Sequence, residues 1–153
     1  MKSKLKLGKK IYIITTYSKY MEKEHINPEN FTKSIGSYSH GMKVDVGDSA
    51  FIFVTGQIAM DKDGNLVSEN VEEQTEFIFH NIQEILNEAG ASLDDVVKAT
   101  IFVTDMNDFS KISPIRNKYF AKSKPASTLV EINKTVKEGC KVEIEVIAIK
   151  KKK

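Results

Sequence analysis

Apolar residues recur along this chain in two rhythms, and each rhythm predicts a different kind of element. Between residues 71 and 89 the spacing is that of an amphipathic helix, with one stripe formed by Val71, Ile78, Ile82, Ile85, Leu86 and Ala89. Asn70 can cap this helix, with Glu73 three residues later, and Gly90 follows where helices often end. The pattern therefore predicts a long helix over residues 71–89.

Shorter β-rich runs predict strands on both sides of this helix. Residues 50–55 are almost wholly apolar, which is typical of a strand buried on both faces. Over residues 141–149 one face would carry Val142, Ile144, Val146 and Ala148, and the other Glu143, Glu145 and Ile147. Further strands are expected at 11–15, 37–46, 96–104 and 128–132.

A second helix is expected near residues 109–122, where Pro114 would interrupt the middle. Ser113 can cap a helix that starts at Pro114, so we expect a turn over 108–112 and then the helix. The order of elements predicts an α+β fold with a single mixed β-sheet and two helices on one face. The other face is also apolar, so we expect another copy of the chain to cover it in a closed homo-oligomer.

Composition narrows the function classes. The chain has 153 residues, 41% hydrophobic, which suits one domain with a proper core. The net charge is only +2, and the lysines gather at the two ends, so nucleic acid is not an expected partner. Cys140 is the only cysteine, which precludes an internal disulfide and a thiolate zinc cage. We expect a cytoplasmic protein without a membrane span, since the early apolar run at 11–14 is too short.

Seven segments, each weak alone, occur together in one order. They are I-G-S-Y-S-H (35–40), V-T-G-Q-I (54–58), E-Q-T with N-I (73–75, 81–82), G-A-S-L-D-D-V-V-K (90–98), F-V-T-D-M-N-D-F (102–109), P-A-S-T (125–128) and V-E-I-E-V-I-A (142–148). In this order they resemble the RidA/YjgF family. Residues 1–25 would then be an N-terminal extension, 26–150 a RidA-like domain and 151–153 a basic tail.

The resemblance implies a chorismate-mutase-like fold that assembles into a barrel-centred homotrimer, with small-molecule clefts between subunits. It implies hydrolytic deamination of reactive 2-enamine and 2-imino acids, with no metal or organic cofactor. On this resemblance Glu143 is the catalytic residue that orients the attacking water. The substrate-binding positions would be Tyr38, His40, Thr55, Gly56, Ser127 and Thr128.

The family's deaminases carry an arginine at the position of Ser127. A guanidinium offers two parallel donors to a carboxylate, and serine cannot copy that geometry. Arg116 is the only arginine in the chain, and its place on the second helix makes it a poor substitute. Lys124 is the alternative cation that could reach the cleft.

Several roles stay open on the sequence alone. Glu143 is either a water-orienting base or an exposed strand carboxylate, and Tyr38 either contacts the ligand or packs across strands. His40 would share a strand face with Tyr38, and it is either a new titratable group in the cleft or a rim residue. The chain could be an imine or enamine hydrolase, an enzyme for another substrate, or a metabolite-binding or regulatory protein. A ribonuclease or translation inhibitor has less support, because basic and aromatic residues do not cluster.

Overall fold

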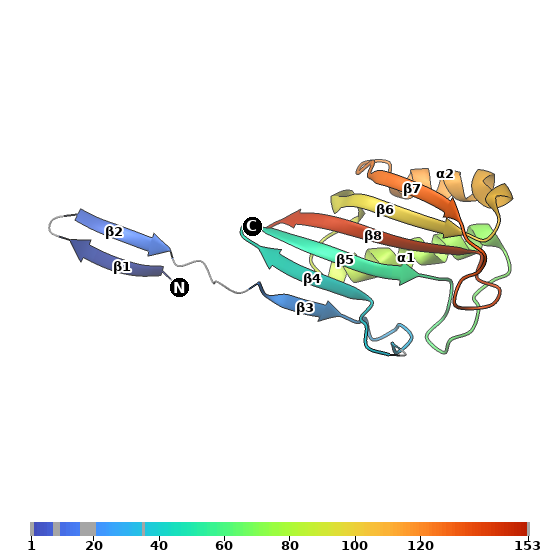
Figure 1. The fold of residues 1–153 in the computed structure, drawn as a ribbon, viewed down its shortest axis with the longest axis horizontal. Coiled ribbons are helices and arrows are strands. Elements are labelled where there is room, and N and C mark those ends of the chain that lie inside the picture. Colours follow the sequence, from blue (N-terminus) through green and yellow to red (C-terminus); the bar gives the residue numbers. More distant parts are fainter. Residues whose placement is uncertain (1, 8–9, 16–20, 35, 153) are drawn as a thin grey trace.

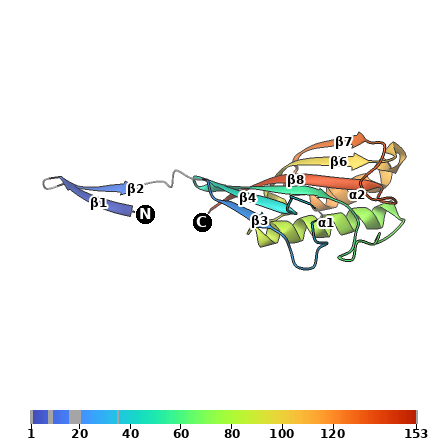
Figure 2. The same ribbon diagram turned by 60° about the horizontal axis from the view of Figure 1, so that its bottom comes forward.

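A computed structural model describes residues 2–7, 10–15, 21–34 and 36–152 of this chain. Its main part is a six-stranded mixed sheet in the order β3–β4–β5–β8–β6–β7 (Figure 1). The strands are β3 (Lys23–Ile26), β4 (Gly41–Val46), β5 (Ser49–Gln57), β6 (Val96–Val103), β7 (Ala126–Glu131) and β8 (Val142–Lys151). Figure 2 shows helices α1 (Val71–Glu88) and α2 (Phe109–Tyr119) on one face of this sheet. The predicted α+β fold is therefore confirmed.

A separate two-stranded sheet precedes the main one. Strands β1 (Lys2–Leu7) and β2 (Lys10–Thr15) pair antiparallel, with Lys2 opposite Thr15. The strand predicted at 11–15 is thus confirmed, whereas β1 and β3 were not predicted. The division at residues 25 and 150 stays a prediction.

The core lies between the sheet and the helices. From α1, the predicted stripe turns toward the sheet and has no exposed surface at Ile78, Ile82, Ile85 and Leu86. Alternate residues of β8 face this stripe of α1, and at most 2% of the surface of each is exposed: Val142, Ile144, Val146 and Ala148. The helix begins as predicted, because the Asn70 side chain accepts a hydrogen bond of 2.9 Å from the N–H of Glu73. No helix in the described ranges is long and apolar enough to cross a membrane.

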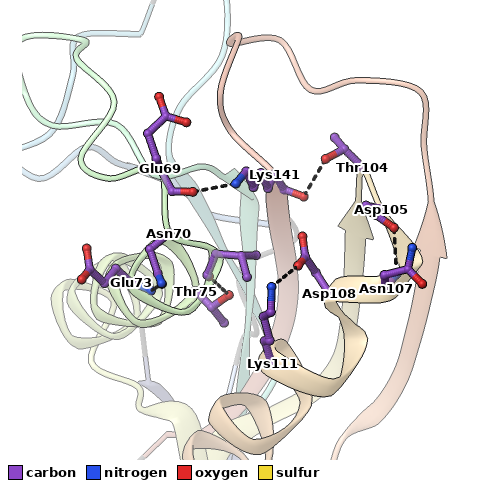
Figure 3. Close-up of polar contacts among 11 residues, drawn as sticks. Glu69, Asn70, Glu73, Thr75, Thr104, Asp105, Asn107, Asp108, Lys111 and Lys141 are labelled. Atoms are coloured by element: carbon purple, nitrogen blue, oxygen red, sulfur yellow. Dashed lines mark hydrogen bonds and ion pairs between the residues drawn. The ribbon is translucent and has the colours of Figure 1, made fainter.

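Polar contacts fix the point at which β8 begins, beside α1 and the end of β6. Lys141 precedes β8, and its Nζ donates to the carbonyl of Glu69 at 2.7 Å, while its own carbonyl accepts from Thr104 (Figure 3). Its backbone N–H donates to Oε1 of Gln74 at 2.8 Å. The buried Gln74 also donates through Nε2 to the carbonyl of Gly139 at 2.8 Å. An amide from α1 therefore anchors the backbone just before β8.

The predicted start of the second helix at Pro114 is wrong. A 3-10 turn (Met106–Asp108) leads directly into α2, which begins at Phe109, so Pro114 lies inside the helix and Ser113 is not its cap. Lys111 pairs with Asp108 at 3.0 Å across this first turn (Figure 3). Ile112 has no exposed surface, and its burial helps to offset the hydrogen bond that Pro114 cannot donate.

The predicted strand over residues 37–46 begins only at Gly41. The preceding segment is held by individual bonds instead of a regular ladder. The Thr55 hydroxyl donates to the carbonyl of Ser39 at 2.8 Å, and the N–H of His40 donates to Oδ1 of Asn27 at 3.0 Å. Tyr38 and His40 therefore lie in a loop, and the expectation that they share a strand face is wrong.

Candidate functional site

Glu143 lies on β8, on the sheet face opposite the helices, and its carboxyl group covers Gly56 of β5. The register of these two strands shifts between Val54 and Gln57, which releases Thr55 and Gly56 from regular pairing. A Cβ at position 56 would lie 2.9 Å from the carboxyl carbon of Glu143 and still closer to its Oε1. The resemblance places Gly56 among the substrate-binding positions, and in this structure the glycine makes room for Glu143.

The environment of Glu143 favours its neutral form. Burial raises the pKa of this carboxyl group above the ordinary 4.5, and the charge of Glu145 adds a smaller rise. No hydrogen-bond donor in the described part of the chain counters this rise. A carboxyl group with a raised pKa can both accept and return a proton, which is what a general base that later acts as an acid requires.

The loop before β4 carries Tyr38 and His40, and Thr55 ties it to the strand next to Gly56. The Tyr38 side chain is open to ligands, with 49% of the residue exposed. His40 is only 7% exposed, and its Nε2 lies 2.8 Å from the carbonyl of Thr32, which places a proton on that nitrogen. Its ring centroid lies 6.3 Å from that of Tyr38, in an edge-to-face arrangement. His40 is thus placed to support Tyr38.

Ser127 and Thr128 lie on the edge strand β7, which runs parallel to β6. Ser127 is opposite Ala99, whose side chain is buried on the helix face, and Thr128 is opposite Thr100 on the other face. Nζ of Lys98 donates to the Thr128 hydroxyl at 2.7 Å. The two predicted neighbours therefore point to opposite faces of the sheet, and Ser127 is on the face away from Glu143.

Ser127 instead lines a pocket of about 520 Å³ where α2 leads into β7. The other lining residues are Arg116, Asn117, Phe120, Ala121, Lys124 and Pro125. Arg116, which its place on the second helix suggested was a poor substitute for the family arginine, thus lines the same pocket as Ser127, and so does Lys124. One chain therefore presents two separate groups: Tyr38, Thr55, Gly56 and Glu143 in one, and Ser127 with two cations in the other.

Sequence reasoning missed that the Gln74 side chain binds the backbone of the segment that precedes Glu143. Gln74 holds the backbone of Lys141, two residues before Glu143. The signal was present, because a glutamine interrupts the apolar stripe of α1 between Val71 and Ile78. A buried polar side chain needs partners, and here those partners lie in the segment that leads into β8.

A larger hollow of about 770 Å³ lies between α1 and α2, and none of the predicted site residues lines it. At its border the Tyr119 hydroxyl donates to Glu76 at 2.5 Å, and burial together with this bond raises the pKa of Tyr119 to about 12. Across the described ranges, no group of three or more His, Cys, Asp and Glu side chains is arranged to hold a metal ion.

Comparisons with known proteins agree with the fold and with the motifs. The Endoribonuclease L-PSP family model matches residues 29–150. A RutC family protein of Pyrococcus abyssi is 45% identical over 131 residues, 85% of this chain and 99% of the relative. The 2-iminobutanoate/2-iminopropanoate deaminase of Bos taurus is 39% identical, over 76% of this chain and 82% of the relative. The crystal structure of E. coli TdcF with bound serine has a TM-score of 0.71 at 30% identity, over 83% of this chain and 98% of that one. This chain therefore belongs to the Endoribonuclease L-PSP family, the RidA/YjgF family that its motifs resemble.

Proposed function

We propose that this protein hydrolyses small 2-imino or 2-enamine carboxylates to a 2-oxo acid and ammonia, in clefts between copies of the chain. The observation that carries this proposal is the carboxyl group of Glu143, held over Gly56 at a strand irregularity, with its pKa raised by burial. The bovine relative named as an imine deaminase supports the reaction, and the relative with bound serine supports a small, amino-acid-like ligand.

Glu143 serves both proton transfers of this reaction. It accepts a proton from a water molecule as the water oxygen forms a bond to carbon 2 of the imine. It returns this proton to the nitrogen, and it then carries the proton of the new hydroxyl group to the same nitrogen, so that the C–N bond breaks and ammonia leaves as the carbonyl of the 2-oxo acid forms. A carboxyl group whose pKa is raised toward the working pH suits both steps. Tyr38 covers the apolar part of the substrate, and Thr55 holds the Tyr38 loop beside Gly56.

The cleft needs two copies of the chain because Glu143 and Ser127 lie on opposite faces of one sheet. The face that carries Glu143 also has an apolar band, in which Phe51 is opposite Ile149 and Phe53 is opposite Ile147. Phe53 is 42% exposed and Ile149 is 37% exposed in the single chain. Exposed apolar bands of this kind are normally interfaces. A homotrimer covers this band and brings Glu143 of one copy toward Ser127 of the next.

Ser127 favours one alternative, a protein that binds a small metabolite without turnover. A serine hydroxyl offers one donor and no charge, so it holds a carboxylate less firmly than an arginine does. The same cleft would then bind a ligand without reaction, and Glu143 would transfer no proton.

Ammonia release from freshly generated 2-iminobutanoate separates these two functions. The wild type should release ammonia above the spontaneous rate, and Glu143→Gln should lower kcat about a hundredfold or more. Glu145→Gln is the matched control, since Glu145 is an exposed residue two positions further along β8 on the same face, and its charge makes only the smaller contribution to the raised pKa of Glu143. Wild-type protein that binds 2-oxobutanoate and releases no ammonia would support the binding function. Equal losses in the two variants would remove Glu143 from the mechanism.

A further inference from the structure

The pocket where α2 leads into β7 contains two cations and no anion. Arg116 and Lys124 lie on its wall with two neutral polar residues, Asn117 and Ser127. Phe120 is only 5% exposed and supplies an apolar surface. A pocket with this lining suits a small anion that carries a short apolar group.

The charges of these two residues are not balanced by nearby carboxylates. In the described part of the chain neither Arg116 nor Lys124 takes part in an ion pair. Six other cations do, each with an Asp or Glu within 3.2 Å: Lys43, Lys111, Lys118, Lys122, Lys150 and Lys152. The pocket therefore brings together two cations whose charge a bound anion could still neutralise.

Neutral neighbours orient the guanidinium of Arg116. Its Nη2 donates to the Ser113 hydroxyl at 2.9 Å and to Oδ1 of Asn117 at 3.0 Å, and its Nε donates to the same Oδ1 at 3.2 Å. A guanidinium has five N–H donors, so the two on Nη1 remain for a ligand. Neutral acceptors fix the position of the group and leave its positive charge available.

Lys124 is placed by an unusual backbone conformation. Its φ of +43° lies in the left-handed region, which glycine or asparagine adopts with less strain than lysine does. The N–H of Lys124 donates to the carbonyl of Phe120 at 3.0 Å, and the N–H of Phe120 donates to that of Arg116 at 3.0 Å. Consecutive backbone bonds therefore fix the backbone of Lys124 relative to that of Arg116, and both side chains line the same pocket.

We propose that Arg116 and Lys124 form an anion subsite that holds the carboxylate of a small 2-oxo or 2-imino acid, with Ser127 as a neutral donor. Arg116 on α2 and Lys124 in the following turn then supply the positive charge that Ser127 lacks. The identity of its ligand as a substrate rests on the proposed function, whereas its anion binding does not.

The test measures binding of 2-oxobutanoate, which carries the carboxylate and cannot be deaminated, by titration calorimetry. Arg116→Gln should weaken binding at least about tenfold, and Lys124→Gln should weaken it several-fold. Lys122→Gln is the matched control, because it removes the same charge two residues away, at a side chain paired with Asp94. It should leave the Kd within about twofold. The uncharged 2-oxobutanamide should bind weakly to every variant.

Each other outcome has a definite meaning. The inference is overturned if the wild type does not bind 2-oxobutanoate, or if Arg116→Gln and Lys124→Gln bind it like the wild type. Losses of stability without losses of binding would show that the two cations only offset the carbonyl end of α2. Inorganic phosphate binding more tightly than 2-oxobutanoate would contradict the carboxylate assignment. Binding that depends on Arg116 in a protein without ammonia release would uphold the subsite and reject the proposed function. Ammonia release by a protein whose binding of 2-oxobutanoate does not depend on Arg116 or Lys124 would uphold the proposed function and reject the subsite.

Discussion

The carboxyl group of Glu143 fills the space in which a side chain at position 56 would lie. A Cβ on Gly56 would approach the Glu143 carboxyl carbon to 2.9 Å, although the two residues are on different strands. The glycine of the V-T-G-Q-I segment and the first glutamate of V-E-I-E are therefore two parts of one arrangement. Because the contact involves the far end of a flexible side chain, a larger residue at 56 moves the carboxyl group and leaves the strands in place.

Gly56→Ala should lower kcat by about a hundredfold while the protein still folds, because an ångström-scale displacement of the catalytic group has effects of this size. Steady-state ammonia release and circular dichroism measure the two parts of this prediction. In a Glu143→Ala background the same substitution should cost less stability than in the wild type, because the carboxyl group that a Cβ at position 56 would meet has been removed. Additive costs in that double-mutant cycle would show that Gly56 and Glu143 do not interact.

Glu143→Gln should stabilise the protein at neutral pH. The pKa of Glu143 is raised in the folded state, so the ionised form of this carboxyl group costs stability above its pKa, and this cost disappears as the pH falls below 4.5. Urea midpoints should therefore be higher for the variant at pH 7 and converge with those of the wild type near pH 4. A variant that is less stable than the wild type at pH 7 would mean that the folded protein stabilises the carboxylate.

Gln74→Met should cost about 1–3 kcal/mol of unfolding free energy, because it leaves the N–H of Lys141 and the carbonyl of Gly139 without their buried partner. It should also lower kcat more than it raises KM, since the segment that leads to Glu143 loses its anchor. Gln83→Met is the control, because Gln83 is an exposed residue of the same helix. Equal effects of the two substitutions on kcat would show that Gln74 has no positioning role.

The buried faces of the main sheet and of α1 were predictable because the spacing of apolar residues alone determines which side chains of a strand or a helix share a face. Alternation along β8 and helical spacing along α1 report burial directly, and both patterns met in the core as expected. Boundaries were less predictable where side-chain bonds compete with regular structure. The loop around Ser39 and His40 is held by hydrogen bonds to Thr55 and Asn27, which are distant in sequence, and no local sequence pattern predicts such bonds.

The candidate site was also predictable only in part. The resemblance identified Glu143 and Ser127, but it could not show that they face opposite sides of one sheet, because that depends on the register of β6 with both β7 and β8. Arg116 was set aside because it belongs to α2. Only the chain path from α2 to β7 brings it to the same pocket as Ser127.

In the proposed cleft, Glu143 of one copy acts on a substrate that Arg116 of another copy holds. Subunit mixing examines this arrangement: ammonia release from 2-iminobutanoate is measured for Glu143→Gln and Arg116→Gln proteins, refolded separately and refolded as an equal mixture. Each variant alone should be impaired. The mixture should show about a quarter of the wild-type activity plus half of the average of the two variants, since random assembly pairs two intact halves in a quarter of the clefts and two altered halves in another quarter. A mixture no more active than that average would contradict a cleft shared between copies.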